Sequence, residues 1–302
     1  MEKYQIVKEL PPGALGMMLE VESRAKGRDT TRKKHMLKKV ECIDENQANN
    51  ALQEVMELLK LKHKNICAYT EFFIIWDNKI SSLFLCLVMN HSHHEDLSSL
   101  IKAKRLRHEG FPNKVIRIFI GQMVDVLVYI HRLNIFHRNL KPSNVLSTGE
   151  ASFMVCDFGS ETLMTDEMKW RIRAEEEPDS KCWMAPEAAN FSFSDKSDIW
   201  SLGSMLLEMI ACSYSKVKEP TLLLHNIKKE ARALEEAVSG MSQLHPLLSS
   251  VLFLMLKIDP SVRSTAEELV ENPFIRECLV EAKSPLIKVT KKFPGFPGHN
   301  SD

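Results

Sequence analysis

The hydrophobic pattern of this 302-residue chain changes near residue 90, and that change limits the folds that the chain can adopt. Before it, short apolar runs such as Tyr4–Leu10, Leu19–Val21 and His35–Val40 are separated by turn residues, which is typical of strands. Leu83–Met89 is apolar without interruption, as expected of a strand covered on both faces. Asn46–Leu61 has helical spacing and contains no proline. This part is predicted to be a β-rich unit with one helix.

Beyond residue 90 the pattern becomes helical. One apolar stripe follows spacings of four and three residues, at Ile116, Ile120, Met123, Leu127 and Ile130. Trp200–Ile210 and Leu247–Ile258 are apolar nearly all round, which predicts buried helices. The expected fold class is α+β, with a small β-rich lobe at residues 1–90 and a larger, mainly helical lobe at 91–274. Residues 275–302 contain prolines and glycines and are expected to form a flexible C-terminal tail.

Composition excludes several classes of function. Lysine plus arginine equals aspartate plus glutamate at 40 each, so no overall field favours nucleic acid or an anionic membrane. The longest apolar run is too short to span a bilayer, and residues 1–7 lack the apolar stretch of a signal peptide. The seven cysteines form no CxxC pair, which fits a reducing compartment. We expect an intracellular, cytoplasmic protein with neither a nucleic acid nor a membrane as partner.

Short motifs follow one another in the helical part. In chain order they are His137–Asn144 (HRNLKPSN), Asp157–Gly159 (DFG), Ala185–Glu187 (APE), Ser197–Gly203 and Asp259–Arg263. A single DFG triplet would mean little, but this order and spacing is highly specific. The series resembles the protein kinase superfamily over residues 4–274, which implies a bilobal protein kinase fold. It is most similar to a group with a degraded catalytic loop, the serine/threonine kinase-like domain-containing proteins, and residues 51–63 resemble NIMA-related kinases.

The resemblance implies a site for ATP and Mg²⁺. Lys38 matches the strand lysine that holds the phosphates, and Glu54 matches the helix glutamate that orients it. Asn144 and Asp157 match the magnesium ligands. Further residues implied to bind the nucleotide are Leu10, Gly13, Gly16, Met18, Met36 and Met89. One alternative stays open, in which Lys38 and Glu54 form only an ion pair that bridges the lobes and Asp157 serves only as a partner of Lys38.

The catalytic loop departs from the family at Asn139. The family has an aspartate there that accepts and orients the substrate hydroxyl, whereas an asparagine amide is neutral and not a useful base. Losing a positioned general base costs about a hundred- to ten-thousandfold in rate. The amide oxygen could still orient a substrate and leave residual activity. Lys141 survives in the loop and implies the serine/threonine class.

The roof of the nucleotide pocket also departs from the family. Pro11 stands at the first glycine of the glycine-rich loop, where it fixes φ and removes a backbone donor. Met18 and Met36 replace small residues that cover adenine. Because methionine is large and fills irregular gaps, we hypothesise that both side chains partly fill the adenine slot. Binding of ATP and Mg²⁺ is therefore predicted to be weak.

The elements that support the fold match the family better than the site does. Leu58, His137 and Phe158, anchored by Asp198, match the hydrophobic column that ties the lobes together. Glu187 and Arg263 match an ion pair that braces the large lobe.

Three weaker signals remain. Glu175–Glu177 could replace a phosphate as the partner of Arg138, although a solvated loop is the simpler interpretation. His91, His93 and His94 lack further ligands, so a metal site is not expected there. Cys156 precedes Asp157 and is a candidate for alkylation.

Together the residues favour a serine/threonine pseudokinase that acts as a scaffold or allosteric partner of an unknown protein. Two alternatives stay open. One is a weakly active serine/threonine kinase that uses Asn139 to orient its substrate. The other is a sensor that binds ATP without transferring phosphate.

Overall fold

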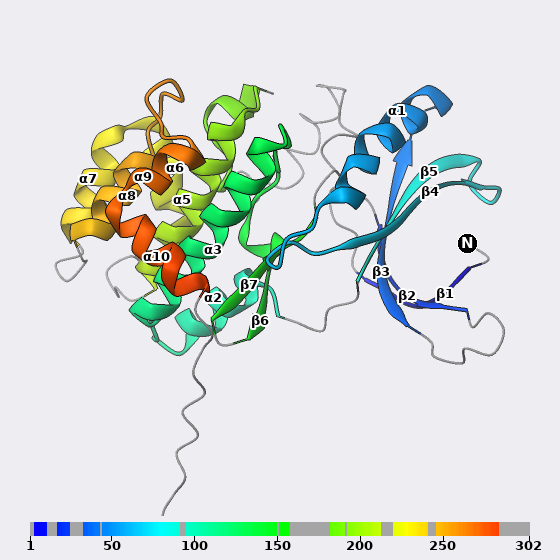
Figure 1. Cartoon of the computed structure of the whole chain (residues 1–302), viewed down its shortest axis with the longest axis horizontal. Coiled ribbons are helices and arrows are strands. Elements are labelled where there is room, and N and C mark those ends of the chain that lie inside the picture. Colours follow the sequence, from blue (N-terminus) through cyan, green and yellow to red (C-terminus); the bar gives the residue numbers. More distant parts are fainter. Residues whose placement is uncertain are drawn as a thin grey trace, which may run out of the picture.

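A computed structural model of the chain describes residues 3–10, 17–24, 33–42, 44–90, 95–149, 151–157, 182–190, 192–212, 220–240 and 246–283. The described residues form a sheet with one long helix on one side of the molecule and a body of helices on the other (Figure 1). This is the α+β, two-lobed arrangement that the hydrophobic pattern predicts.

A five-stranded antiparallel sheet forms the small lobe, with the strand order β1-β2-β3-β5-β4. The strands are β1 (Tyr4–Glu9), β2 (Met17–Ser23), β3 (Lys34–Cys42), β4 (Tyr69–Asp77) and β5 (Ser82–Asn90). Side chains alternate between the two faces, so Leu19, Leu37 and Val88 pack with Tyr4 in a small cluster on one face. Leu85 and Leu87 point to the opposite face and belong to the main core.

The helix α1 (Glu45–Met56) packs on this lobe and continues into a 3-10 turn, η1 (Glu57–Lys60). Its buried residues Ala48, Ala51 and Val55 repeat at spacings of three and four, which presents one apolar stripe to the sheet. The Asp44 carboxylate accepts a hydrogen bond from the Gln47 backbone N–H at 2.7 Å and so caps the start of the helix.

The large lobe is built around α5 (Asp195–Ala211), which is buried along most of its length. Around it lie α2 (Leu97–Leu106), α3 (Asn113–Arg132), α6 (Pro220–Lys229), α7 (Ala231–Gly240), α8 (Pro246–Met255), α9 (Ala266–Glu271) and α10 (Pro273–Lys283). The predicted helices at residues 116–130, 200–210 and 247–258 correspond to α3, α5 and α8. Within the described ranges, none of these helices has the length and hydropathy needed to cross a bilayer.

A hairpin and two short 3-10 turns complete this lobe. β6 (Val145–Gly149) pairs with β7 (Ser152–Val155), and the 3-10 turns are η2 (Pro142–Asn144) and η4 (Glu187–Asn190). The hairpin lies between the sheet and the helices (Figure 1). Val155 bridges to Ile66 in the segment after η1, and its carbonyl accepts from the Cys67 backbone N–H at 2.8 Å. The end of β7 is thereby attached to both lobes.

The predicted tail begins too early. Residues 275–283 belong to α10, whose Ile275 and Cys278 are fully buried against α3. A Cβ atom added to Gly121 of α3 would lie 2.3 Å from the carbonyl oxygen of Cys278, so the two helices can pack this closely only because residue 121 is glycine. Pro273 suits the first turn of a helix, and the apolar spacing continues beyond it. The prediction was wrong because proline was interpreted as the end of order, and residues 284–302 lie outside the described residues.

Candidate functional site

An ion pair between Lys38 and Asp157 lies at the centre of the site. The Lys38 ammonium, on β3, lies 2.6 and 2.8 Å from the two carboxylate oxygens of Asp157, which follows β7. The Lys38 side chain is 6% exposed and the Asp157 side chain 18%. Asp157 has a φ of 64°, an unusual value for a residue other than glycine, and this places its side chain where it meets β3. The pair therefore joins the sheet of the small lobe to the large lobe.

The pairing agrees with the prediction that Asp157 is a partner of Lys38. Glu54, the other predicted partner, lies in α1, but its side chain is not among those that the structure describes. The predicted Lys38–Glu54 pair therefore stays a prediction.

Three methionines share a sheet face with Lys38. In the strand register Met18 lies opposite Lys38, and Met36 lies opposite Met89. Directly paired residues, and residues two apart on one strand, project from the same face of a sheet. Met89 is buried and Met36 packs against the main core, so this face is largely apolar. The arrangement puts Met18, Met36 and Met89 on the nucleotide-facing side that the resemblance implies.

The glycine-rich loop is only partly described. Leu10 leads into it and donates its backbone N–H to the Met18 carbonyl at 2.9 Å, which closes the strand pair at that end. Pro11, Gly13 and Gly16 lie outside the described residues. Their predicted roles at the phosphates stay predictions.

The buried carboxylate of Asp198 on α5 holds the catalytic loop. It accepts hydrogen bonds from the backbone N–H groups of His137 at 2.8 Å and Arg138 at 3.0 Å, and His131 Nε2 lies 2.9 Å from it. Arg138 has a φ of 63°, a conformation that costs a non-glycine residue of order 1–3 kcal/mol and needs such support. Asp198 therefore anchors the backbone of His137, and the His137 and Leu58 side chains are both buried, while the complete column stays a prediction. Phe158 lies outside the described residues.

Further contacts fix the backbone of Asn139. Its backbone N–H lies 3.3 Å from His137 Nδ1, and its carbonyl accepts a hydrogen bond from the Asn144 side-chain amide at 2.8 Å. Burial lowers the pKa of His137, which keeps the ring neutral with Nδ1 as acceptor and Nε2 as donor to the Cys156 carbonyl at 3.1 Å. Among the described contacts, no hydrogen bond engages the side-chain amide of Asn139. The loop fixes the backbone of residue 139 and leaves its side chain available.

The loop continues directly into the ion pair. The Asn144 carbonyl accepts from the backbone N–H of Cys156 at 2.9 Å, and Asp157 is the next residue. Asn139, Asn144, Asp157 and Lys38 are thus joined by successive contacts. Lys141 is half-buried in the same loop. The structure therefore brings these five predicted residues together.

Cys156 is poorly suited to alkylation. Burial, with a contribution from the adjacent Asp157 carboxylate, raises the pKa of its thiol well above the usual cysteine value. The thiol also donates to the Asn144 carbonyl at 3.3 Å. Because the thiolate is the reactive form, this environment disfavours the predicted reactivity.

The predicted brace of the large lobe is confirmed. Arg263 donates to the two carboxylate oxygens of Glu187 at 2.6 and 3.0 Å, and Arg263 is 1% exposed. Burial acts to raise the pKa of Glu187, but the hydrogen bonds from Arg263 outweigh it and hold the pKa below its ordinary value.

Sequence reasoning missed a buried carboxylate at Glu208. It accepts hydrogen bonds from Trp183 Nε1 at 2.8 Å and from the Arg105 guanidinium at 3.0 Å, and burial raises its pKa. These contacts tie α2 and the segment before Glu187 to α5. The available signal was a single acidic residue in the otherwise apolar run 200–210.

Two predicted features lie outside the described residues, namely Glu175–Glu177 and the histidines at positions 91, 93 and 94. Among the described residues, no group of three or more histidine, cysteine, aspartate or glutamate side chains could hold a metal ion.

For Mg²⁺ bound with a nucleotide, the Asn144 side-chain oxygen and the Asp157 carboxylate supply the oxygen ligands that this ion prefers. Both groups are of the ligand type that Mg²⁺ prefers, although the Asp157 carboxylate already pairs with Lys38.

Comparison with known proteins gives a consistent result. Residues 4–275 match the family model described as the protein kinase domain. Nek6, a serine/threonine-protein kinase of Oryza sativa subsp. japonica, is 27% identical over 292 residues, which cover 94% of this chain and 50% of that protein. A probable serine/threonine-protein kinase of Dictyostelium discoideum, nek2, is 28% identical over 94% of this chain and 65% of its own length. MAP3K epsilon protein kinase 2 of Arabidopsis thaliana is 26% identical over 94% of this chain and 20% of its own length. The chain spans less than two thirds of each relative.

Proposed function

Because the chain belongs to the protein kinase domain family, we propose that it is a serine/threonine pseudokinase, a scaffold or allosteric partner of another protein. One observation carries the proposal. The loop is fully braced around residue 139, through Asp198, His137 and Asn144, yet that position holds an amide. A substrate hydroxyl placed beside Asn139 would meet an oxygen that can orient it and no group that can take its proton.

The nucleotide side of the site supports the same proposal. Lys38 and Asp157 pair with each other, so ATP would have to compete with this contact for Lys38. If Met18 and Met36 also fill the roof, inserting adenine overpacks the site, which typically costs about 1–3 kcal/mol. Both effects act against nucleotide binding.

The residues that would hold the nucleotide are nevertheless present. Lys38 would contact the phosphates, and Asn144 and Asp157 would hold Mg²⁺, which supplies charge neutralisation at the phosphates when it is bound. This observation favours, as a second candidate, a protein that binds ATP weakly without transferring phosphate.

The described contacts that support the fold match the family, in contrast to the site. Glu187–Arg263 and the Asp198 contacts hold the large lobe and its loop in place. A chain of this kind can present a stable surface to a partner without phosphoryl transfer. The partner is unknown, and the relatives' names identify none.

Thermal unfolding with ATP and Mg²⁺ tests the nucleotide side. We expect little stabilisation of the wild type at physiological ATP, because bound ligand stabilises by only RT ln(1 + [L]/Kd) and Kd is high. Met36→Ala, which reopens the roof, is expected to increase the shift, whereas Met56→Ala, an exposed methionine of α1, is the matched control. A large saturable shift in the wild type would contradict the filled roof.

A further inference from the structure

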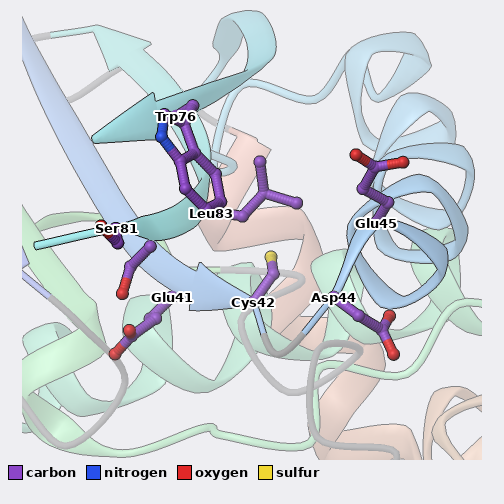
Figure 2. A pocket seen from close by; sticks show the side chains of 8 residues that line it. Glu41, Cys42, Asp44, Glu45, Trp76, Ser81 and Leu83 are labelled. Carbon is purple, nitrogen blue, oxygen red and sulfur yellow. The ribbon is translucent and has the colours of Figure 1, made fainter. Parts of the chain in front are cut away.

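A groove unrelated to the Lys38 site lies at the far end of β3, where α1 begins. It has a volume of about 510 Å³ and lies between the end of β3, the start of α1 and the hairpin that joins β4 to β5. Figure 2 shows Cys42 and Leu83 in its middle, with Glu41, Asp44 and Glu45 toward the rim. It holds no residue of the predicted catalytic or nucleotide site.

The rim of this groove is negatively charged. Glu41 and Glu45 are exposed, and among the described residues neither carboxylate has a hydrogen-bond or ion-pair partner. Asp44 uses one carboxylate oxygen to cap α1. The described lining contains no lysine, arginine or histidine. The nearby Lys39 is already paired with Asp77 at 2.7 Å. The groove therefore favours a cationic occupant.

The hairpin side of the groove presents Trp76 and Leu83 beside Ser81 and Ser82. Trp76 is 58% exposed, and Ile80 at the turn of the same hairpin is 60% exposed. Large exposed apolar side chains next to a groove are typical of a surface that another segment covers. An occupant that carries aromatic groups next to its positive charges would match both sides.

One segment of this chain has that composition. After α10 the sequence continues as SPLIKVTKKFPGFPG, in which Lys288, Lys291 and Lys292 precede Phe293 and Phe296. Between Lys288 and Phe296 there is no acidic residue. Its charge and its aromatic groups complement the acidic rim and the exposed hairpin.

The segment also starts from a suitable place. The Lys64 ammonium donates to the Ala282 carbonyl at 3.2 Å, so α10 ends beside the residues that follow η1. From there back to the groove the chain runs through η1 and α1, a path of roughly 40 Å at most from helical rises and an extended connection. An extended chain covers about 3.3 Å per residue, so from Lys283 the chain can reach about 17 Å at Lys288, about 26 Å at Lys291, about 30 Å at Lys292 and about 43 Å at Phe296. Because the path of roughly 40 Å along η1 and α1 is an upper bound on the separation, Lys291–Phe296 can reach the groove, whereas Lys288 is too close to α10 to do so.

We propose that Lys291–Phe296 docks within the same molecule into the groove of Glu41, Asp44, Glu45 and Trp76. Lys291 and Lys292 face the carboxylates, and the two phenylalanines pack on Trp76 and Leu83. Docking would connect the start of α1 to the end of α10 through the segment that follows Lys283. The proposal does not depend on whether the site transfers phosphate.

Zero-length carbodiimide cross-linking of the full chain, followed by mass spectrometry, tests the docking. We expect cross-links between Lys291 or Lys292 and the three carboxylates of the groove, with a yield that does not change on dilution. In a mixture of ¹⁵N-labelled and unlabelled chains, the linked peptides should join segments of the same isotope. In an equal mixture, mixed-isotope links that make up about half of the total would show that a second copy occupies the groove, and no links would show that this segment does not dock; either result overturns the proposal.

A variant that keeps all the lysines and carboxylates distinguishes specific docking from chance encounters of a segment that is merely attached to the same chain. Phe293→Ala with Phe296→Ala leaves the lysines and carboxylates intact, and the yield should fall about tenfold or more, because two buried aromatic groups are lost. Trp76→Ala should lower the yield as well, whereas Leu106→Ala, at an exposed leucine on α2, should not. An unchanged yield in both aromatic variants would mean that only chance encounters of a tethered chain were trapped, and would refute the proposal.

Discussion

A double-mutant cycle on Lys38 and Asp157 measures how much this ion pair contributes to the stability of the fold. The changes are Lys38→Met, Asp157→Asn and the two together, in the absence of nucleotide. Each single change leaves the other charge in a largely buried place, and the double change leaves neither. The interaction energy between the two positions isolates the pair even if Lys38 has a further contact.

The expected coupling follows from the geometry. Two unit charges 2.6 Å apart attract by roughly 6 kcal/mol at an effective dielectric constant of 20. The desolvation of each ion cancels in the cycle, but in each single variant the remaining charge can turn toward water and so recover part of the lost attraction. A coupling of about 2 kcal/mol is therefore expected, within the usual range for charged groups in contact.

Urea unfolding of the four proteins gives the coupling. The matched control is the same cycle on Lys60 and Glu57, which also lie 2.6 Å apart but are exposed on η1. There we expect less than about 0.5 kcal/mol. A coupling at Lys38–Asp157 as small as in the control would refute the view that this ion pair stabilises the fold.

Two further changes test the packing of the large lobe. Glu187→Gln should lower the free energy of unfolding by about 3–5 kcal/mol in urea, because it leaves the buried Arg263 without its counterion. The pKa of Glu187 is lowered in the folded state, so the stability of the wild type should fall as the pH drops below about 4.5. This pH dependence should be weaker in the variant, which lacks the carboxylate. Gly121→Ala should destabilise the fold by about 1–3 kcal/mol or more and increase hydrogen exchange in α10, because its methyl group meets the Cys278 carbonyl; unchanged exchange in α10 would contradict the close packing.

Much of the fold could be predicted from local pattern. The strands and the main helices follow directly from hydrophobic spacing, since residues that repeat with the period of a strand or helix must share a buried face. Glu187–Arg263 and Asp198 could be identified only through the motif series, because their partners lie far away in sequence.

The remaining features depend on three-dimensional contacts. Lys38 could pair with a helix residue or with Asp157, and only the φ of 64° at Asp157 and the approach of β7 bring the second partner close. Glu208 is a single acidic residue within an apolar run, and its burial is explained only by the hydrogen bonds that Arg105 and Trp183 donate to its carboxylate. The length of α10 was hidden because its partner, Gly121, lies in a helix far earlier in the chain.

A phosphoryl-transfer assay on a generic serine/threonine substrate tests the central claim most directly. It compares the wild type with Asn139→Asp, which supplies the missing carboxylate in a loop that already holds that backbone, and with Asn139→Ala as the matched control. We predict that the wild type and Asn139→Ala give no transfer above a Lys38→Ala background, and that Asn139→Asp yields at most weak transfer, limited by nucleotide binding. Wild-type transfer that disappears in Lys38→Ala would contradict the account and make the chain a working kinase.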